Sequence, residues 1–253
     1  MTALDAFTAA AVLLAGGLIG ATGIGGVLVV PALTGLAGLQ VTQAIAASAL
    51  AFALPGIAAL WWLARSGAGL ARWSALLLGA LPAAAAGAWA VHSVQAGWLL
   101  SAVGVVALFS GARGLWQLAG RRPAQVPGRE LRPWELASLG AGIGLASALT
   151  GTGGPVLLVP LWMVLGQPLA LTVAAAQVIQ LPVALAAGAA HASAGALDVA
   201  LALYLGVLLL AGSIAGQAAA RKLPVPALQA LVSVLLLAVG LWFSWRAAAP
   251  HFA

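Results

Sequence analysis

Residues 17–33, GLIGATGIGGVLVVPAL, and residues 144–162, GLASALTGTGGPVLLVPLW, are two similar glycine-rich stretches set in apolar sequence. Each has a glycine cluster at its centre, in residues 22–26 and 150–154, and reaches a proline several apolar residues later, at Pro31 or Pro160. Inside a helix, glycine costs about 1 kcal/mol and proline about 3 kcal/mol relative to alanine. We therefore predict that each stretch interrupts a helix.

The composition around these stretches indicates a membrane protein. Of the 253 residues, 64% are hydrophobic and only 6% are charged, whereas about a quarter of the residues of a soluble domain are charged. This excludes a cytosolic enzyme, a disordered chain and a secreted disulfide scaffold. A membrane β-barrel would alternate polar and apolar residues, whereas residues 76–90 are apolar on every side. Because the chain has no cysteine, it has no thiolate metal site and no cysteine nucleophile.

Eight apolar segments are long enough to be considered as membrane spans, since about 20 residues cross the hydrocarbon core. They are residues 8–38, 42–63, 73–91, 97–119, 134–166, 169–190, 198–219 and 225–246. Tryptophans lie close to the ends of these segments, which is typical of an interfacial belt. They are Trp61, Trp62, Trp73, Trp89, Trp98, Trp116, Trp134, Trp242 and Trp245.

The two halves of the chain resemble each other, which predicts an internal duplication. Corresponding landmarks are separated by 127 to 129 residues, among them the two glycine clusters, Pro55 with Pro182, and Gly79 with Gly206. A basic, proline-containing stretch separates the halves. We therefore predict a first transmembrane repeat at residues 1–119, a cytoplasmic linker at 120–133 and a second repeat at 134–253.

Charge placement favours one of two topologies. If each glycine-broken first segment folds back as a hairpin, three full crossings remain per repeat, and nine of the ten basic residues lie on the linker's side. If all eight segments cross, eight of ten do. The hairpin model places Asp5 and Asp198 opposite the linker and inverts the two repeats. We interpret the net charge of +6 as a positive-inside signal and expect no nucleic-acid binding.

The doubled glycine motifs resemble those of the sulfite exporter family of the TauE/SafE type, in the toluene-sulfonate uptake permease superfamily. The resemblance covers nearly the whole chain. It implies an all-helical fold of two homologous halves that transports sulfite, sulfonates or sulfoacetate across a bacterial inner membrane. Ile24 and Thr152 stand where these motifs often have glycine, which would narrow backbone freedom or tune the pocket.

The predicted spans contain few charged groups, so we expect an anion to be bound by neutral donors at a midplane site. Broken helices expose N–H groups and the positive ends of helix dipoles, and paired broken segments mark the binding site of many secondary transporters. The candidate substrate-binding residues are Thr22, Gly23, Gly25, Gly26, Pro31, Gln43, Ser48, Thr150, Gly151, Thr152, Gly153, Gly154, Gln177 and Gln180.

Other roles for these residues remain open. Glycine and threonine often only allow close helix packing, although the glycines cluster at one point per half and no GxxxG repeat dominates a span. The glutamines and Ser48 are equally suited to interhelical hydrogen bonds. We expect His191 to be a solvated interfacial residue, with a proton relay as the alternative.

The functional alternatives are an anion channel, a permease for other small anions or carboxylates, and a structural membrane subunit. A membrane enzyme is disfavoured because the chain has no GxSxG motif and no metal-ligand cluster. We expect no catalytic residue, no cofactor and no bound metal. The expected partners are a small anion, the lipid bilayer, a coupling proton or sodium ion, and a second copy in a homodimer.

Overall fold

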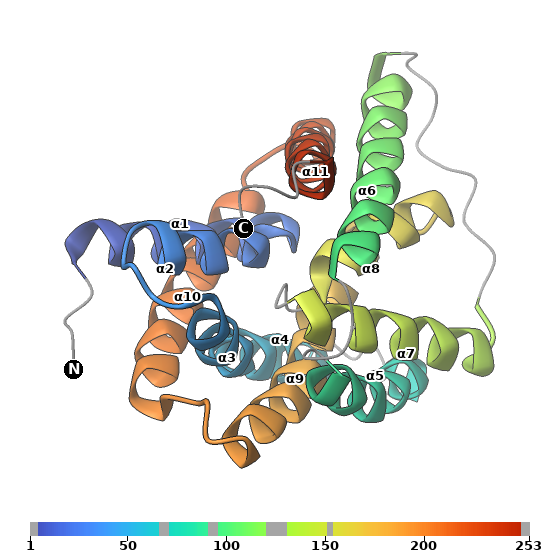
Figure 1. Ribbon diagram of the computed structural model, residues 1–253. Helices are drawn as coiled ribbons and strands as arrows, with labels where there is room; N and C mark the ends of the chain where they lie inside the picture. The colour runs from blue at the N-terminus through green and yellow to red at the C-terminus, as the bar shows by residue number, and fades with distance from the viewer. Residues whose placement is uncertain (1–4, 66–70, 91–95, 120–130, 151–153, 249–253) are drawn as a thin grey trace.

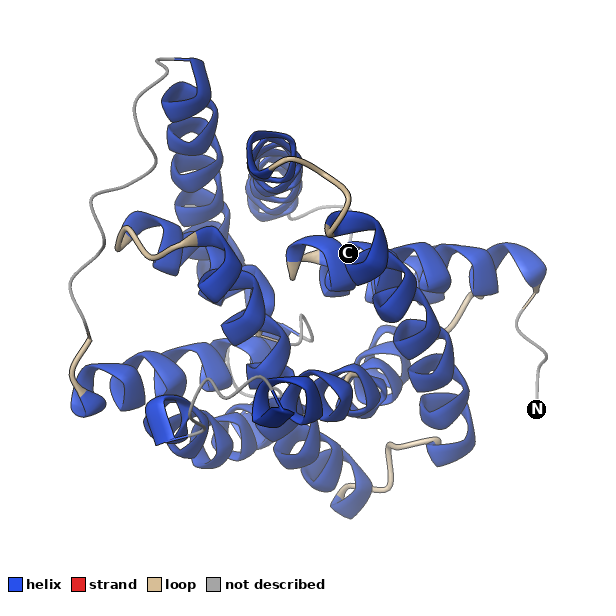
Figure 2. Cartoon of the chain, turned by 180° about the vertical axis from the view of Figure 1, so that it is seen from behind, coloured by secondary structure: helices blue, strands red, loops and turns tan. Residues whose placement is uncertain are grey.

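The computed structural model describes residues 5–65, 71–90, 96–119, 131–150 and 154–248, and all of their regular structure is helical (Figures 1 and 2). The first half contains α1 (Ala6–Thr22), a short 3-10 helix η1 (Gly25–Leu28), α2 (Val29–Gly35), α3 (Val41–Ala51), α4 (Ala53–Arg65), α5 (Ala71–Ala90) and α6 (Ala96–Ala119). The second contains α7 (Pro133–Thr150), α8 (Pro155–Val164), α9 (Leu169–Ser193), α10 (Val199–Ala220) and α11 (Val225–Ala248). The predicted all-α fold is confirmed.

Each half begins with an interrupted helix, as the glycine clusters predicted. Gly23 ends α1 with a φ of 81°, and Gly154 precedes α8 with a φ of 97°, a backbone region that favours glycine. The helices that follow are short: α2 has seven residues and α8 has ten. At 1.5 Å per residue these are roughly 10 and 15 Å long, so neither crosses a hydrocarbon core of about 30 Å.

Five stretches within the described residues are long and apolar enough to cross a membrane. They are Gln43–Arg65, Trp73–Ala90, Leu171–Ser193, Val199–Ala220 and Val225–Trp242. Helix α6 has 24 residues, or roughly 36 Å, so it also has the length to cross. The architecture is that of a polytopic membrane protein.

The three most extensive helix pairs each combine one helix from the first half with one from the second. Helix α1 lies along α10, α7 lies along α5, and α6 pairs with α11 (Figure 1). Helix α9 passes through the middle of the molecule and packs against α3, α4 and α5. Since α1 corresponds in sequence to α7, and α10 to α5, the two pairings match each other as a duplication requires. The inverted arrangement of the repeats remains a prediction.

Glycines bring these helix pairs into backbone contact. A Cβ on Gly16 would lie 2.6 Å from the carbonyl oxygen of Leu209 on α10, and one on Gly216 would overlap the carbonyl oxygen of Gly17. Gly140 and Gly144 of α7 pack in the same way against α5. Our expectation that the glycines gather only at the breaks was therefore wrong: they also line the α1–α10 and α5–α7 interfaces, as close packing in membranes requires.

The tryptophan belt has an exception. Trp73 and Trp162 are 2% and 3% exposed, and their rings stack with centroids 5.5 Å apart. Trp73 was predicted to be interfacial, but it packs in the core at the start of α5 because α8 brings Trp162 against it. Seven others that were predicted are exposed: Trp61, Trp62, Trp89, Trp116, Trp134, Trp242 and Trp245. The side chain of Trp98 lies outside the described residues.

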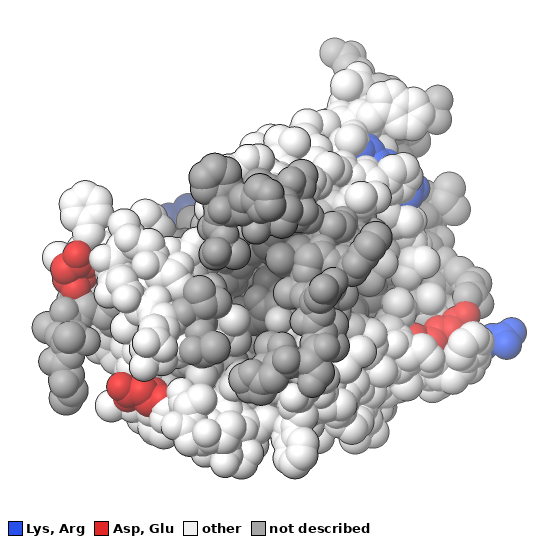
Figure 3. Space-filling view, in the orientation of Figure 1, with Lys and Arg blue, Asp and Glu red and all other residues white. Residues whose placement is uncertain are grey.

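Charged side chains lie at the edge of the molecule. On the face shown in Figure 3, the described Lys, Arg, Asp and Glu residues lie at its margin, and the rest of the described surface is uncharged. Predicted cytoplasmic linker residues 120–130 lie outside the described residues. The described apolar surface is the one expected of helices that face lipid.

Candidate functional site

The first break is held by hydrogen bonds within its own turn. The N–H of Gly23 donates to the carbonyl oxygen of Ile19 at 2.9 Å. The hydroxyl of Thr22 donates to the carbonyl oxygen of Leu18 at 2.7 Å and accepts from the N–H of Ile24 at 3.2 Å. Both the hydroxyl of Thr22 and the N–H of Ile24 are therefore engaged inside the protein, where they stabilise the turn.

After the break the chain folds back along α1. A Cβ on Gly25 would overlap the carbonyl oxygen of Ala15 and lie 2.7 Å from the nitrogen of Ile19. Only glycine fits at this approach, so packing alone accounts for Gly25. Gly26 is buried in the same short helix, and Pro31 is half-buried in α2.

The second break is described from Gly154 onward. The carbonyl oxygen of Gly154 accepts from the N–H groups of Leu157 and Leu158 at 3.2 and 3.1 Å, which starts α8. Pro155 occupies the first helical position, where a missing N–H costs nothing. The candidate residues Gly151, Thr152 and Gly153, and the side chain of Thr150, lie outside the described residues.

The two breaks lie against the same helix, α9. A Cβ on Gly23 would lie 3.0 Å from Cβ of Ala176 on α9 and 3.4 Å from Cγ2 of Val159 on α8. A Cβ on Gly154 would lie 3.2 Å from Cγ2 of Ile179 on α9. The interrupted segments are thus buried in protein near each other, within about one turn of α9, and η1 also contacts α8 directly.

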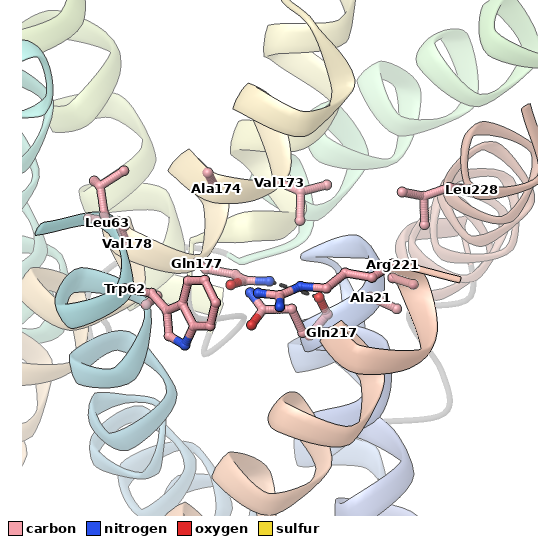
Figure 4. Close-up of a pocket in the computed structure, with 13 residues that line it drawn as sticks. Ala21, Trp62, Leu63, Val173, Ala174, Gln177, Val178, Gln217, Arg221 and Leu228 are labelled. Carbon is pink, nitrogen blue, oxygen red and sulfur yellow. Dashed lines mark hydrogen bonds between the residues drawn. The ribbon is translucent and has the colours of Figure 1, made fainter. Parts of the chain in front are cut away.

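A pocket of about 350 Å³ opens beside the first break (Figure 4). Five helices contribute to it: the end of α1, the end of α4, the first half of α9, the end of α10 and the start of α11. The lining residues are Gly20, Ala21, Ala59, Trp62, Leu63, Val173, Ala174, Gln177, Val178, Gln217, Ala220, Arg221 and Leu228.

The polar groups of this pocket converge. Gln177 donates from Nε2 to the carbonyl oxygens of Ile19 and Gly20, at 3.2 and 2.9 Å. In Figure 4 the side chains of Gln217 and Arg221, from α10, extend toward Gln177 on α9, and Trp62 of α4 lies beside them. Cζ of Arg221 is 4.3 Å from the centroid of the Trp62 ring, a cation–π contact.

The other predicted polar residues are placed differently. Gln180 is buried on α9, one turn beyond Gln177, and its Nε2 lies 3.5 Å from the carbonyl oxygen of Ala176. Ser48 is buried in α3 and donates to the carbonyl oxygen of Ile45 at 3.0 Å. Gln43 is exposed in the first turn of α3. Of the four, the structure brings Gln177 into the pocket and Gln180 next to it.

Of the 13 lining residues only Gln177 was among our candidates, and the missed residues with polar or aromatic side chains are Trp62, Gln217 and Arg221. Trp62 and Arg221 were assigned to the membrane interface and to topology because both lie at span ends. Gln217 precedes Arg221 by four residues, so the two lie on one helix face, and this pair in an apolar helix is a signal that the sequence does contain. His191, expected to be solvated, is 8% exposed near the end of α9.

One of three comparisons with known proteins found a match. A protein-family model described as sulfite exporter TauE/SafE matches residues 8–243. No curated protein and no solved structure matches the chain.

Proposed function

Because the chain belongs to the sulfite exporter TauE/SafE family, a family of membrane transporters, we propose that it is a secondary transporter for a small sulfur-containing oxyanion. Sulfite and sulfonates are the proposed substrates. The protein moves them across the bacterial inner membrane by alternating access. The supporting observation is the pocket beside the first break, which is lined by one cationic side chain, Arg221, and two side-chain amides, Gln177 and Gln217.

Arg221 is the primary anion-binding group in this proposal. Its guanidinium presents several N–H donors in a planar fork that matches an oxyanion. The ring of Trp62 holds the guanidinium at the pocket. Because Arg221 is exposed at the end of α10, its charge does not pay a full desolvation cost, and the anion is free to leave.

The pocket is mechanically linked to the broken helix. Gly20 and Ala21, in the last turn of α1, line it, and Gln177 is hydrogen-bonded to that turn. Movement of the α1 end relative to α9 would therefore change the pocket directly. Broken helices that border a site in this way are a recurring device of secondary transporters.

Flux measurements with an arginine variant test this role. Purified protein in liposomes should take up radiolabelled sulfite, and Arg221→Gln should raise the apparent KM at least tenfold, because a hydrogen bond to a charged group contributes about 1.5–3 kcal/mol. Arg65→Gln is the matched control, since Cζ of Arg65 lies 4.1 Å from the Trp61 ring and Arg65 does not line the described pocket. Equal effects of the two changes would show a surface-charge effect and contradict the proposal.

Counterflow tests alternating access. Unlabelled sulfite inside the liposomes should accelerate entry of labelled sulfite, because a carrier returns faster when it is loaded. Flux without this acceleration, rising linearly with concentration, would instead indicate an anion channel.

A further inference from the structure

Gln180 has a buried side-chain amide that its surroundings do not satisfy. The residue is 1% exposed, and among the described residues its Oε1 has no hydrogen-bond donor. Among the described residues its Nε2 has one hydrogen-bond acceptor, the carbonyl oxygen of Ala176 at 3.5 Å, which is the outer limit of a hydrogen bond. Buried amides are nearly always hydrogen-bonded, so an exception calls for a ligand or a specific role.

The position of Gln180 connects the pocket with the two breaks. It lies three residues beyond Gln177 on α9, and three residues of helix advance roughly 4.5 Å. Its neighbours in the chain touch both interrupted segments: Ala176, one turn before it, lies against Gly23, and Ile179 lies against Gly154. Gln180 is not itself a lining residue of the described pocket, but it lies one turn along α9 from the lining residue Gln177, where the broken segments approach this helix.

Gln177 and Gln180 both offer acceptor oxygens here. The amide nitrogen of Gln177 is engaged by the end of α1, and in Figure 4 its carbonyl oxygen lies on the side away from that contact. Oε1 of Gln180 also lacks a donor among the described residues. A fully ionised oxyanion has only acceptors, so it cannot donate to these oxygens, whereas a singly protonated oxyanion has one O–H donor.

We infer that Gln180 accepts a hydrogen bond from the hydroxyl of a singly protonated oxyanion, so that the transported form of sulfite is hydrogensulfite. This rests on the proposed function and specifies the form of its substrate. The oxygens of the anion bind the donors of Arg221, and its O–H is directed inward to Gln180. Each transported anion then carries one proton with it.

No other described group near Gln180 supplies a proton. The helices packed against α9 carry their titratable and charged residues toward their ends, and none hydrogen-bonds to Gln180 in the described part of the chain. These residues are Asp5 before α1, Arg65 on α4 and Glu135 on α7, and His191 lies near the end of α9 itself; the side chain of Arg72 on α5 lies outside the described residues. The proton on the anion is therefore the one that the amide oxygen can recognise.

The pH dependence of sulfite flux tests this inference. Wild-type protein in liposomes should transport sulfite, at constant total concentration, at rates that rise with the hydrogensulfite fraction as the pH falls. Protein-free liposomes give the background. With the lumen alkaline enough for the entering hydrogensulfite to dissociate, a pH-sensitive dye there should report one proton released per sulfite, a measurement that needs no variant.

Gln180→Leu should lower the flux at least tenfold at acidic pH and flatten the pH profile, because the acceptor is gone. Gln229→Leu is the matched control: it removes a partly buried amide on α11, whose Nε2 contacts the carbonyl oxygen of Gly114 at 3.4 Å, and should leave the profile unchanged. Wild-type flux that follows the sulfite dianion, or an unchanged profile in Gln180→Leu, would overturn the inference while leaving an Arg221-dependent transporter intact. Absence of wild-type flux at every pH would overturn both proposals.

Discussion

Gly23 shows at the level of one residue why the first break needs glycine. Gly23 and Gly38 both have a positive φ, of 81° and 65°. An alanine at either position would be strained by about 1–2 kcal/mol. Their surroundings differ: a Cβ on Gly38 would meet open space, whereas one on Gly23 would lie 3.0 Å from Cβ of Ala176.

We expect Gly23→Ala to destabilise the protein more than Gly38→Ala does, because only the former adds a steric contact with α9. Thermal unfolding in detergent measures both, and Gly23→Ala should also reduce sulfite flux per folded molecule. Equal melting temperatures would show that α9 moves away from the break without cost.

A substitution at Gly25 distinguishes a packing role of this glycine from a role in substrate binding. Its Cβ would overlap the carbonyl oxygen of Ala15, so Gly25→Ala should lower the melting temperature strongly and reduce flux only through loss of folded protein. Size-exclusion profiles and flux normalised to folded protein distinguish these effects. A selective loss of flux at normal stability would instead return Gly25 to the substrate site.

The sequence indicated some site residues better than others. Gln177 and Gln180 were identifiable because each is a polar residue in an apolar helix. The hydrogen bonds of Thr22 with Leu18 and Ile24 could not be identified from the sequence, because they depend on the turn that Gly23 makes. Arg221 was assigned to topology because a charge at a span end has two explanations, and only the packing of α10 beside α4 shows that it reaches the pocket.

At the scale of elements, the α1–α10 interface depends on glycines with no room for a side chain. A Cβ on Gly216 would overlap the carbonyl oxygen of Gly17, whereas one on Gly142 of α7 would meet nothing within 4 Å. Gly216→Ala should therefore separate the helices and lower the melting temperature. Gly142→Ala should raise it slightly, since alanine favours a helix by about 1 kcal/mol. Loss of stability in both variants would contradict this account of the interface.

The end of α8 is held by a side chain from α6. Nη1 of Arg113 donates to the carbonyl oxygen of Val164 at 2.9 Å, so its positive charge faces the negative end of the α8 dipole. Arg113→Gln should loosen this end by about 0.3–1 kcal/mol, seen as faster hydrogen exchange in residues 161–166. Arg113→Lys keeps the charge and should change the hydrogen-exchange rate less. An unchanged rate in both variants would show that the contact does not stabilise the end of α8.

The bounds of most helices followed from the apolar segments, but one division did not. Residues 42–63 were predicted as one span, and Gln43–Arg65 is long and apolar enough to cross, but the stretch is divided at Phe52, where α3 ends at Ala51 and α4 begins at Ala53. Pro55 explains the division, because proline cannot donate to the carbonyl four residues earlier and its ring crowds that carbonyl. Pro182 corresponds to Pro55, yet α9 continues through it. A proline in the local sequence therefore does not by itself decide whether the helix divides.

At the scale of the whole molecule, the structure places Trp62 and Arg221 at one end of the bundle. Because the chain has no cysteine, single cysteines can map this end. Ala64→Cys and Lys222→Cys should be labelled by an impermeant thiol reagent from the same side of the membrane, and Ser193→Cys from the other. Labelling of Ala64→Cys and Lys222→Cys from opposite sides would refute the hairpin topology.

The sequence predicts an internal duplication, but it did not predict which helices pair across the two halves. Matching motifs such as Pro55 and Pro182 indicate that the two halves are related, yet they carry no information about which half packs on which. Here α1 lies on α10 and α7 on α5, so the core belongs to both halves at once. Neither predicted repeat packs as a separate domain in this structure.

The α1–α10 contact has a consequence for how the protein is made. Helix α1 is synthesised well before α10, so residues 23–198 must leave the ribosome before the two helices meet. Until then the glycine-lined face of α1 faces lipid or an insertion factor. A nascent chain that ends before α10 leaves α1 without its partner. We expect quality-control proteases that recognise unassembled helices to degrade such a chain.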